Sequence, residues 1–342
     1  MKLQKSYLLF ISLLFVLLVL VWFLNINLGS VSIPFSDVIS SIFEGKASKE
    51  SWHTIIVNFR IPKAITAVLV GSGLSISGLL MQTLFRNPLA GPFVLGISSG
   101  ASLGVALLIL GSSLLGGIAV GYLSTFGLAI AASLGSFIVM SAVLIVANRV
   151  RNTMSILIIG LMFGSITAAI ISVLSYFSNP EKLQQFIFWG FGSLGNLSWN
   201  ELGVFSTLFF ISLSLIVFIL KPLNSLLLGE NYANSIGVNI KRTRNLILII
   251  TCLLTGVITA FSGPIAFVGL AVPHIARLLF NTSNHKILIP ASAILGAVLM
   301  LFADIFAQLP SSEYTLPINA ITSIFGAPIV IWLLVRKKNI YL

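Results

Sequence analysis

Apolar runs close to the thickness of a lipid bilayer recur along the whole length of this chain. The first extends from Tyr7 to Leu24, and the others follow at short intervals. About 20 consecutive apolar residues are enough for a helix to cross a hydrocarbon core of about 30 Å. Hydrophobic residues make up 57% of the 342 residues and charged residues 8%, whereas soluble domains carry about 25% charged residues. The sequence therefore predicts an integral membrane protein.

Ten of these runs are predicted to be transmembrane helices, which gives an all-α fold: one polytopic bundle in a single domain over residues 1–342. The first run follows Lys2 and Lys5 but exceeds the about 7–15 apolar residues of a signal peptide, so we expect it to be retained. Cys252 has no second cysteine with which to pair. The predicted spans cover residues 7–27, 62–84, 92–113, 117–147, 153–176, 203–221, 245–262, 264–280, 288–308 and 317–335.

Basic residues are distributed unevenly over the loops between these spans. The chain carries 19 Lys and Arg against 8 Asp and Glu, a net charge of +11. Such an excess is also typical of nucleic-acid-binding proteins, but no basic cluster here exceeds three residues and each lies just outside an apolar run. With both termini in the cytoplasm, 14 of the 19 basic residues lie on the cytoplasmic side, as the positive-inside rule requires. We therefore predict cytoplasmic termini and no nucleic-acid partner.

Three segments outside the spans are long enough to carry structure of their own. Residues 28–61 and 177–202 are predicted to be extracytoplasmic. In the first of them, Ser36-Asp37 precedes an apolar stretch in the manner of a capped interfacial helix. Residues 222–244 form the longest cytoplasmic loop and contain a short amphipathic pattern. We expect that pattern to form a helix lying on the inner face of the membrane.

Small and polar residues inside the spans indicate how the bundle is packed. Small residues recur four apart, for example at Gly71 and Ser75, and this spacing lets helices approach closely in lipid. Asp304 is the only acid well inside a span. Two roles are open for it. It is a structural group that pairs with a helix end or with a neighbouring hydroxyl, or it belongs to a gate or a translocation path. A proton- or sodium-coupled carrier usually has several buried ionisable groups, so that class is a remote alternative.

Patterns for catalysis and nucleotide binding are missing. The three histidines lie on different segments, and His274 has no Cys, His, Asp or Glu at metal-ligand spacing. The phosphate-binding pattern GxxxxGK followed by Ser or Thr is missing too, since Gly45-Lys46 runs into Ala47. We therefore predict a protein that is not an enzyme and binds no metal or cofactor. If ATP drives it, ATP and Mg²⁺ bind to a separate polypeptide.

Several strings of residues resemble the FecCD/BtuC-type permease subunits of iron-chelate (siderophore or haem) and cobalamin ABC importers. The match covers nearly the whole chain, with the motifs in the same order and spacing. In the first half the strings are Arg60-Ile61-Pro62-Lys63, Gly71 to Gln82, Arg86 to Pro92 and Leu95 to Ala101. In the second half they are Leu228-Gly229-Glu230, Gly263 to Leu270, Pro273 to Arg277, Ala303-Asp304, Leu316-Pro317 and Gly326 to Pro328.

This resemblance implies a type II ABC importer permease of ten helices, in which helices two to five and seven to ten form an inverted internal repeat. It also implies the partners: a second permease copy, with the pathway at the subunit interface, two cytoplasmic ATPase subunits, and an extracytoplasmic solute-binding protein. The expected location is the bacterial inner membrane. The expected cargo is an iron chelate, either a siderophore or haem. Cobalamin is the alternative within the family.

The resemblance assigns roles to particular residues. Arg60 and Lys63 match a basic pair that docks the solute-binding protein, while the third basic residue of that set is replaced by Gln308. Gly96, Ser98, Ser99 and Asp304 are expected in the translocation path or its gate. The loop that couples to the ATPase matches Leu228, Gly229, Glu230, Tyr232, Ala233, Ile236 and Gly237. Within it Glu230 and Tyr232 are expected to face the ATPase, with Leu228, Ala233 and Ile236 as packing and the two glycines in turns.

Overall fold

The computed structural model describes residues 2–111, 124–147, 149–150, 153–195, 197–309 and 314–335. Every regular element in these residues is helical. Three of them, η1, η2 and η5, are not α-helical: η1 is a π-helical turn, and the other two are 3₁₀ turns. The elements are α1 (Lys2–Asn27), α2 (Phe35–Phe43), α3 (Glu50–Ile55), η1 (Ile56–Arg60), α4 (Ile61–Phe85), η2 (Pro92–Leu95), α5 (Ile97–Ile109), α6 (Thr125–Ala147), α7 (Thr153–Tyr176), α8 (Pro180–Gly190), α9 (Trp199–Ser214), η5 (Leu215–Ile219), α10 (Leu220–Leu226), α11 (Glu230–Ser235), α12 (Ile240–Ser262), α13 (Val268–Phe280), α14 (His285–Ala307) and α15 (Ile318–Val335).

Ten of these helical segments correspond to the ten predicted spans. In the described residues, seven helices are long and apolar enough to cross a membrane, and three shorter apolar helices accompany them. The shorter ones are Ile97–Ile109, Val268–Phe280 and Ile318–Trp332. The predicted all-α membrane bundle is confirmed, and three of its spans have fewer helical residues than a full crossing needs.

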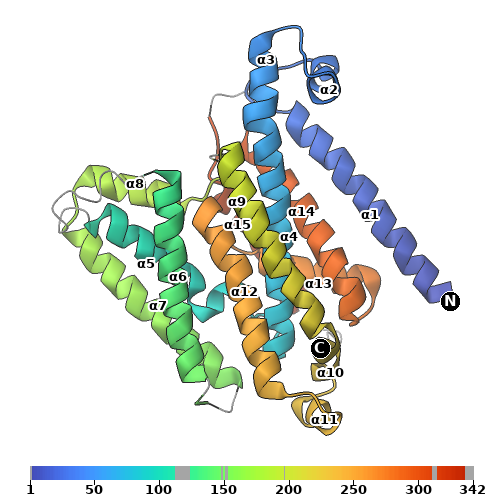
Figure 1. The fold of residues 1–342 in the computed structure, drawn as a ribbon, viewed down its shortest axis with the longest axis vertical. Helices are drawn as coiled ribbons and strands as arrows, with labels where there is room; N and C mark the ends of the chain where they lie inside the picture. The colour runs from blue at the N-terminus through green and yellow to red at the C-terminus, as the bar shows by residue number, and fades with distance from the viewer. Residues whose placement is uncertain are drawn as a thin grey trace.

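Helix α4 lies at the centre of the bundle, between α5, α6 and α7 on one side and α1, α13 and α14 on the other (Figure 1). Small residues make its closest contacts. A side chain on Gly71 would overlap the carbonyl of Gly296 in α14, and one on Gly78 would overlap the carbonyl of Gly269 in α13. Small-residue spacing therefore produces the close helix approach that the sequence indicated, because lipid supplies no hydrophobic force between helices.

Both halves of the bundle contain a broken helix. A long helix ends at Phe85 or Ser262, and an irregular stretch leads in each case to a 13-residue helix, α5 or α13. The residue before each short helix is left-handed, with φ of 75° at Gly96 and 66° at Phe267. Interrupted helices at corresponding positions of the two halves are the mark of an internal repeat in transporters.

Several boundaries differ from the prediction. The second span begins at Glu50 rather than residue 62, because α3 and the π-helical turn η1 extend α4 outward without a break. The α13 span begins at Val268, since Gly263 with φ 72° starts an extended stretch. The predicted side-chain cap of α2 is wrong: its N-cap residue is Pro34, which has no side-chain donor or acceptor.

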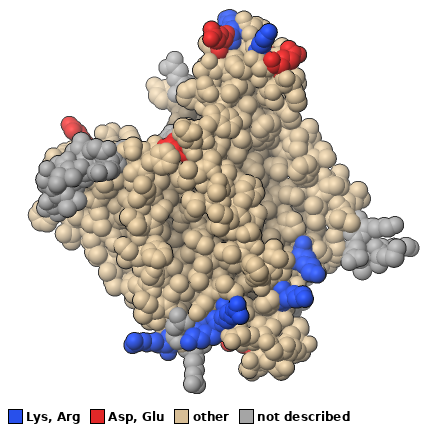
Figure 2. Space-filling view, in the orientation of Figure 1, with Lys and Arg blue, Asp and Glu red and all other residues tan. Residues whose placement is uncertain are grey.

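Charged side chains gather at the two ends of the molecule, and the belt between them is almost uncharged in the face shown (Figure 2). We call these the α2–α3 end and the α11 end, after the helices that form them. In Figure 1 the start of α1 lies toward the α11 end. An uncharged belt between two charged ends is the surface of a helix bundle that crosses a membrane.

Candidate functional site

A cavity of about 640 Å³ opens toward the α2–α3 end. Its walls come from the end of α1, from η1 and α4, from the segment after α8, and from the facing ends of α14 and α15. Charged or polar groups in its lining include Arg60, Lys63, Asp304 and Gln308, and Phe59, Phe188 and Phe191 add aromatic surface. The cavity therefore combines a few polar groups with apolar walls, as ligand and partner sites do.

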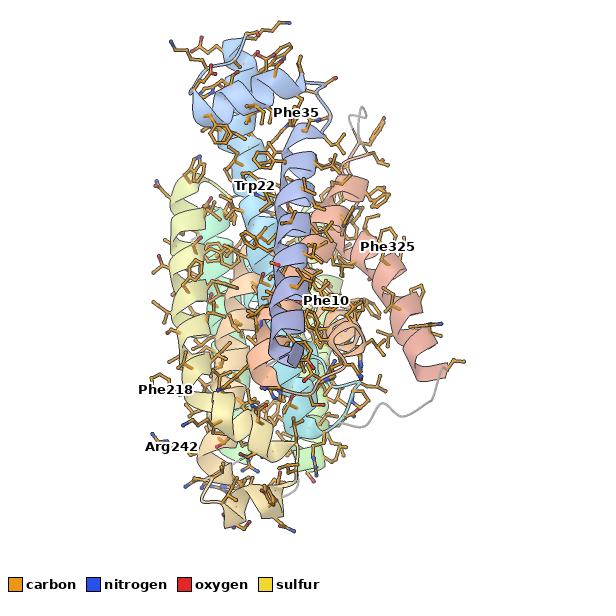
Figure 3. All side chains as sticks on the ribbon, turned by 90° about the vertical axis from the view of Figure 1, so that its right-hand side faces the viewer. Phe10, Trp22, Phe35, Phe218, Arg242 and Phe325 are labelled. Atoms are coloured by element: carbon orange, nitrogen blue, oxygen red, sulfur yellow. The ribbon has the colours of Figure 1, made fainter. Side chains whose placement is uncertain are left out.

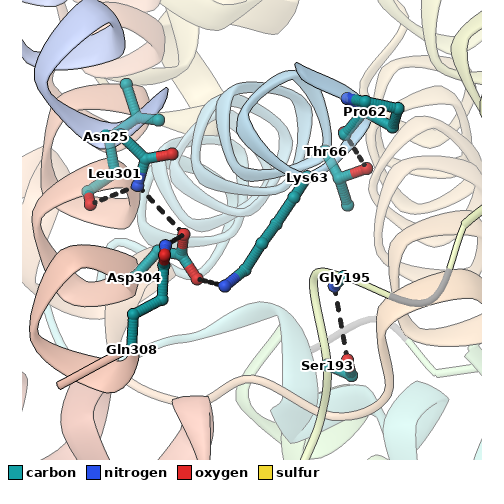
Figure 4. Close-up of polar contacts among 9 residues, drawn as sticks. All are labelled: Asn25, Pro62, Lys63, Thr66, Ser193, Gly195, Leu301, Asp304 and Gln308. Atoms are coloured by element: carbon teal, nitrogen blue, oxygen red, sulfur yellow. Dashed lines mark hydrogen bonds and ion pairs between the residues drawn. The ribbon is translucent and has the colours of Figure 1, made fainter. Parts of the chain in front are cut away.

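Asp304 is the centre of a polar network in this cavity (Figure 4). Its carboxylate lies 3.0 Å from the Lys63 ammonium, and it accepts hydrogen bonds from Asn25 at 2.9 Å and from Gln308 at 2.6 Å. Its side chain is almost fully buried, whereas that of Lys63 is 22% exposed. The network ties α1, α4 and α14 together. A buried carboxylate needs such compensation, because an unpaired charge away from water is costly.

Arg60 lies close to this network but is engaged within the fold. Its guanidinium donates to the carbonyls of Ile26 and Asn27, both at 2.8 Å, and to that of Val31. The side chain is buried. The donors therefore satisfy carbonyl groups at the end of α1 that have no partner inside the helix. The pairing of Arg60 and Lys63 at one cavity agrees with their sequence spacing, and their role in docking stays a prediction.

The cavity wall formed by the segment after α8 is held by backbone hydrogen bonds to the end of α12 and to the start of α15. Ser193 N–H donates to the carbonyl of Ser262 at 2.9 Å, and Asn319 N–H donates to that of Phe191 at 3.2 Å. The side chain of Asn319 accepts from Ala266 N–H at 3.0 Å. The broken helix α12–α13 is thereby joined to the start of α15 and to the cavity rim.

Gly96, Ser98 and Ser99 do not belong to this cavity. Gly96 and Ser99 lie against α7, where Gly160 and Gly164 leave room for them. The structure therefore does not bring these residues together with Asp304, which lines the cavity at the α2–α3 end. Their place in a translocation path stays a prediction.

At the α11 end, the short helix α11 and the residues on either side of it form an exposed apolar surface. Leu228, Tyr232 and Ile236 are 65%, 49% and 53% exposed, and Ala233 is buried. Leu228 and Ile236, expected as packing residues, are thus exposed in this chain, on either side of a helix of one and a half turns. The flanking glycines take φ values of 112° at Gly229 and 87° at Gly237, which other residues rarely adopt.

Arg86 joins this surface to α4. It ends α4 in a left-handed conformation, and its guanidinium donates to the carbonyl of Leu227 at 3.0 Å, just before α11. On the same turn, the His274 ring nitrogen Nε2 lies 2.8 Å from the carbonyl of Pro88. Motion of α11 would therefore reach the central helix directly. The sequence flagged Arg86 only as part of a motif, because its partner is 141 residues away.

Three comparisons identify relatives. The chain matches the FecCD transport family over residues 17–336. It is 34% identical to the hemin transport system permease protein HmuU of Yersinia pestis, over 97% of this chain and 96% of that one. It is 38% identical to the vitamin B12 import system permease protein BtuC of Klebsiella pneumoniae, over 83% of each chain.

A solved structure shares the fold. It is an inward-facing conformation assigned to the metal-chelate type of ABC transporter, and it superposes with a TM-score of 0.82 at 30% identity, covering 96% of this chain and 99% of that one. The helical bundle, its polytopic membrane character and the family match over nearly the full length agree with one another. The chain belongs to the FecCD transport family.

Proposed function

We propose that this chain is the permease subunit of an ATP-driven, binding-protein-dependent importer, with both termini in the cytoplasm. The observation that carries the proposal is the exposed apolar surface of Leu228, Tyr232 and Ile236 at the α11 end. Such a surface outside the membrane belt is typical of an interface, and it fits the cleft of a cytoplasmic ATPase. Two ATPase subunits supply ATP and Mg²⁺, while this chain hydrolyses nothing and holds no cofactor.

The distribution of charge supports this orientation. Lys221 in α10 and Lys241 and Arg242 at the start of α12 are exposed and lie on the elements next to α11. Lys286, at the start of α14 beside α10, is exposed as well. Lys and Arg accumulate on the cytoplasmic side of membrane proteins. The cavity around Lys63 then opens to the extracytoplasmic side, where a solute-binding protein docks. A second copy of the chain completes the translocation path between two subunits.

For the cargo, we propose an iron chelate such as haem or a ferric siderophore, with cobalamin as the alternative. Similarity to a hemin permease over nearly the full length favours an iron chelate. The shorter match to vitamin B12 permeases is the reason that cobalamin remains the alternative. The cavity rim offers Phe59, Phe188 and Phe191, which suit a large flat or ring-shaped ligand. The test measures uptake of labelled haem, ferric siderophores and cobalamin in cells with and without this chain. If only cobalamin uptake is lost, cobalamin and not an iron chelate is the cargo. Uptake that does not depend on ATP would refute the proposed ATP-driven import.

Placing acidic residues on the exposed surface of α11 is expected to detach the ATPase. In the double variant Leu228→Asp with Ile236→Asp, two carboxylates replace apolar contacts, and we expect at least about 30-fold weaker retention of the ATPase. Co-purification from detergent measures it. Asn231→Asp with Asn234→Asp adds the same charge on exposed polar positions of the same helix and serves as the control. Equal retention in the two double variants would mean that the ATPase contacts another surface.

Reversing the exposed charge of the cavity while keeping its ion pair is expected to weaken docking of the solute-binding protein. In Lys63→Asp with Asp304→Lys the pair persists, but an acid replaces the base that reaches the cavity. We expect at least tenfold weaker docking, measured on the purified transporter with its binding protein. Lys46→Gln with Lys49→Gln removes exposed charge at the tip near α2 and α3. If only this second pair weakens docking, the contact lies at the tip instead of the cavity.

A further inference from the structure

An apolar groove of about 660 Å³ runs along the flank of the bundle between α4, the continuous segment α9–η5–α10, and α14. Two of the polar side chains in its wall, Ser72 and His285, already have partners within the protein. The Ser72 hydroxyl donates to the carbonyl of Ala293 at 3.0 Å, and the His285 ring nitrogens lie 2.8 Å from Thr83 and from Asn224. Apart from Lys286, the surface that the groove offers to a ligand is therefore apolar.

Two breaks in helical regularity shape the groove. On one wall, α9 tightens into the 3₁₀ turn η5, which displaces Ile216 and Val217 relative to a continuous α-helix. On the other wall Pro290 lies inside α14, where its ring bends the helix away from the preceding turn. The concavity is thus built into the backbone of both walls.

The groove has the length of one membrane leaflet. On α14 its lining runs from His285 to Ile294, and nine residues of α-helix rise about 14 Å. This is half of the about 30 Å hydrocarbon core. His285 begins α14 at the α11 end, so the groove extends from that surface to the middle of the membrane.

Two lysines flank the end of the groove that reaches the membrane surface. Lys286 lines it directly, and Lys221 follows the lining residue Leu220. Both side chains are exposed. Asn224, one turn beyond Lys221, accepts from His285 N–H at 2.9 Å and thereby holds α10 against α14. Among the described acids only Glu230 belongs to this end of the molecule, and no acid lines the groove.

We propose that this groove binds one acyl chain of an anionic glycerophospholipid from the leaflet at the α11 end, with its phosphate between Lys221 and Lys286. The apolar groove, one leaflet long, matches the acyl chain, and the two exposed lysines at the headgroup level match the charge of the phosphate. Figure 3 shows Phe218, next to the lining residue Val217, pointing away from the bundle. The site is therefore open to lipid from the side. It is independent of the transported cargo and of the ATPase surface on α11.

Native mass spectrometry of the purified chain, released from bilayers of phosphatidylcholine and phosphatidylglycerol, tests the proposal. We expect one retained phosphatidylglycerol per chain in preference to phosphatidylcholine. Lys221→Gln with Lys286→Gln should reduce this preference about 30-fold, because each lysine near a membrane surface contributes about fivefold. Lys241→Gln with Arg242→Gln removes exposed charge outside the groove lining and should leave it unchanged. Equal preference in both variants would refute the headgroup site.

A second pair of variants tests the acyl-chain slot. Val217→Trp fills the groove and should abolish retention of both lipids, whereas Phe218→Trp, one residue along and outside the lining, should not. Val217→Cys in a Cys252→Ser background tests whether protein occupies the groove instead. Disulfide-linked dimers in native membranes would show that a second copy covers it, and would overturn the proposal.

Discussion

Replacing Asp304 with leucine is expected to be among the most destabilising single changes in this protein. The substitution removes the partner of the Lys63 ammonium and the acceptor used by Asn25 and Gln308. Breaking a buried ion pair by removing one partner costs about 3–5 kcal/mol. We expect a value near the lower bound, since Lys63 keeps some exposure. Thermal unfolding in detergent, followed by the loss of monodisperse protein, measures the effect.

The companion variant separates stability from transport. In Lys63→Met with Asp304→Leu both charges are gone, and we expect much of the stability to return, because replacing a whole buried pair is often close to neutral. A double variant as unstable as Asp304→Leu alone would show that the pair does not compensate the buried carboxylate. If the double variant folds and still docks the solute-binding protein but imports nothing, Asp304 has a direct role in the path. Import at the original rate would leave it a structural group.

Replacing Gly296 with leucine is expected to prevent assembly of the central helices. A Cβ at this position would overlap the Ser75 hydroxyl and the carbonyl of Gly71. Overpacking an ordinary core costs about 1–3 kcal/mol, and the cost here is larger because a backbone carbonyl, rather than the end of a flexible side chain, occupies the space. The yield of folded protein after membrane extraction measures it.

Gly203→Leu is the matched control for this change. Gly203 lies in α9, and apart from the adjacent backbone of α9 itself no described atom approaches within 4 Å of the position that its Cβ would take. Leucine is also a better helix former than glycine, by roughly 0.5–1 kcal/mol. We therefore expect a normal or slightly higher yield. Similar losses at Gly203 and Gly296 would mean that the α4–α14 contact does not depend on close backbone approach.

Properties that depend on local sequence could be predicted well. Apolar runs of membrane length gave the ten helices, and small residues four apart indicated close contacts such as that of Gly71 with Gly296. Helix ends were less accurate. The second span continues outward to Glu50, because α3 and η1 carry polar residues that a hydropathy pattern excludes from a span.

Properties that depend on distant partners could not be predicted. From the sequence, Arg60 is interpreted as an exposed base at a membrane surface. In the structure it is buried against two carbonyls at the end of α1 and a third, that of Val31, in the segment that follows. From the sequence, Leu228 and Ile236 are interpreted as packing residues, but among the described residues both side chains are more than half exposed. In both cases the sequence shows the chemistry of the side chain, and the neighbours that decide its environment come from elsewhere in the fold. The resemblance to known permeases named these positions without showing their surroundings.

The pairing of Lys63 with Asp304 also has a consequence for biosynthesis. Lys63 enters the membrane with the second helix, whereas Asp304 is synthesised roughly 240 residues later with the ninth. At about 5–20 residues per second, the lysine waits on the order of 10–50 s for its counter-ion. Until then its long side chain must reach the aqueous surface to keep the ammonium hydrated. We therefore expect the nascent second helix to lie closer to that surface at first, and to reach its final depth when the ninth helix arrives.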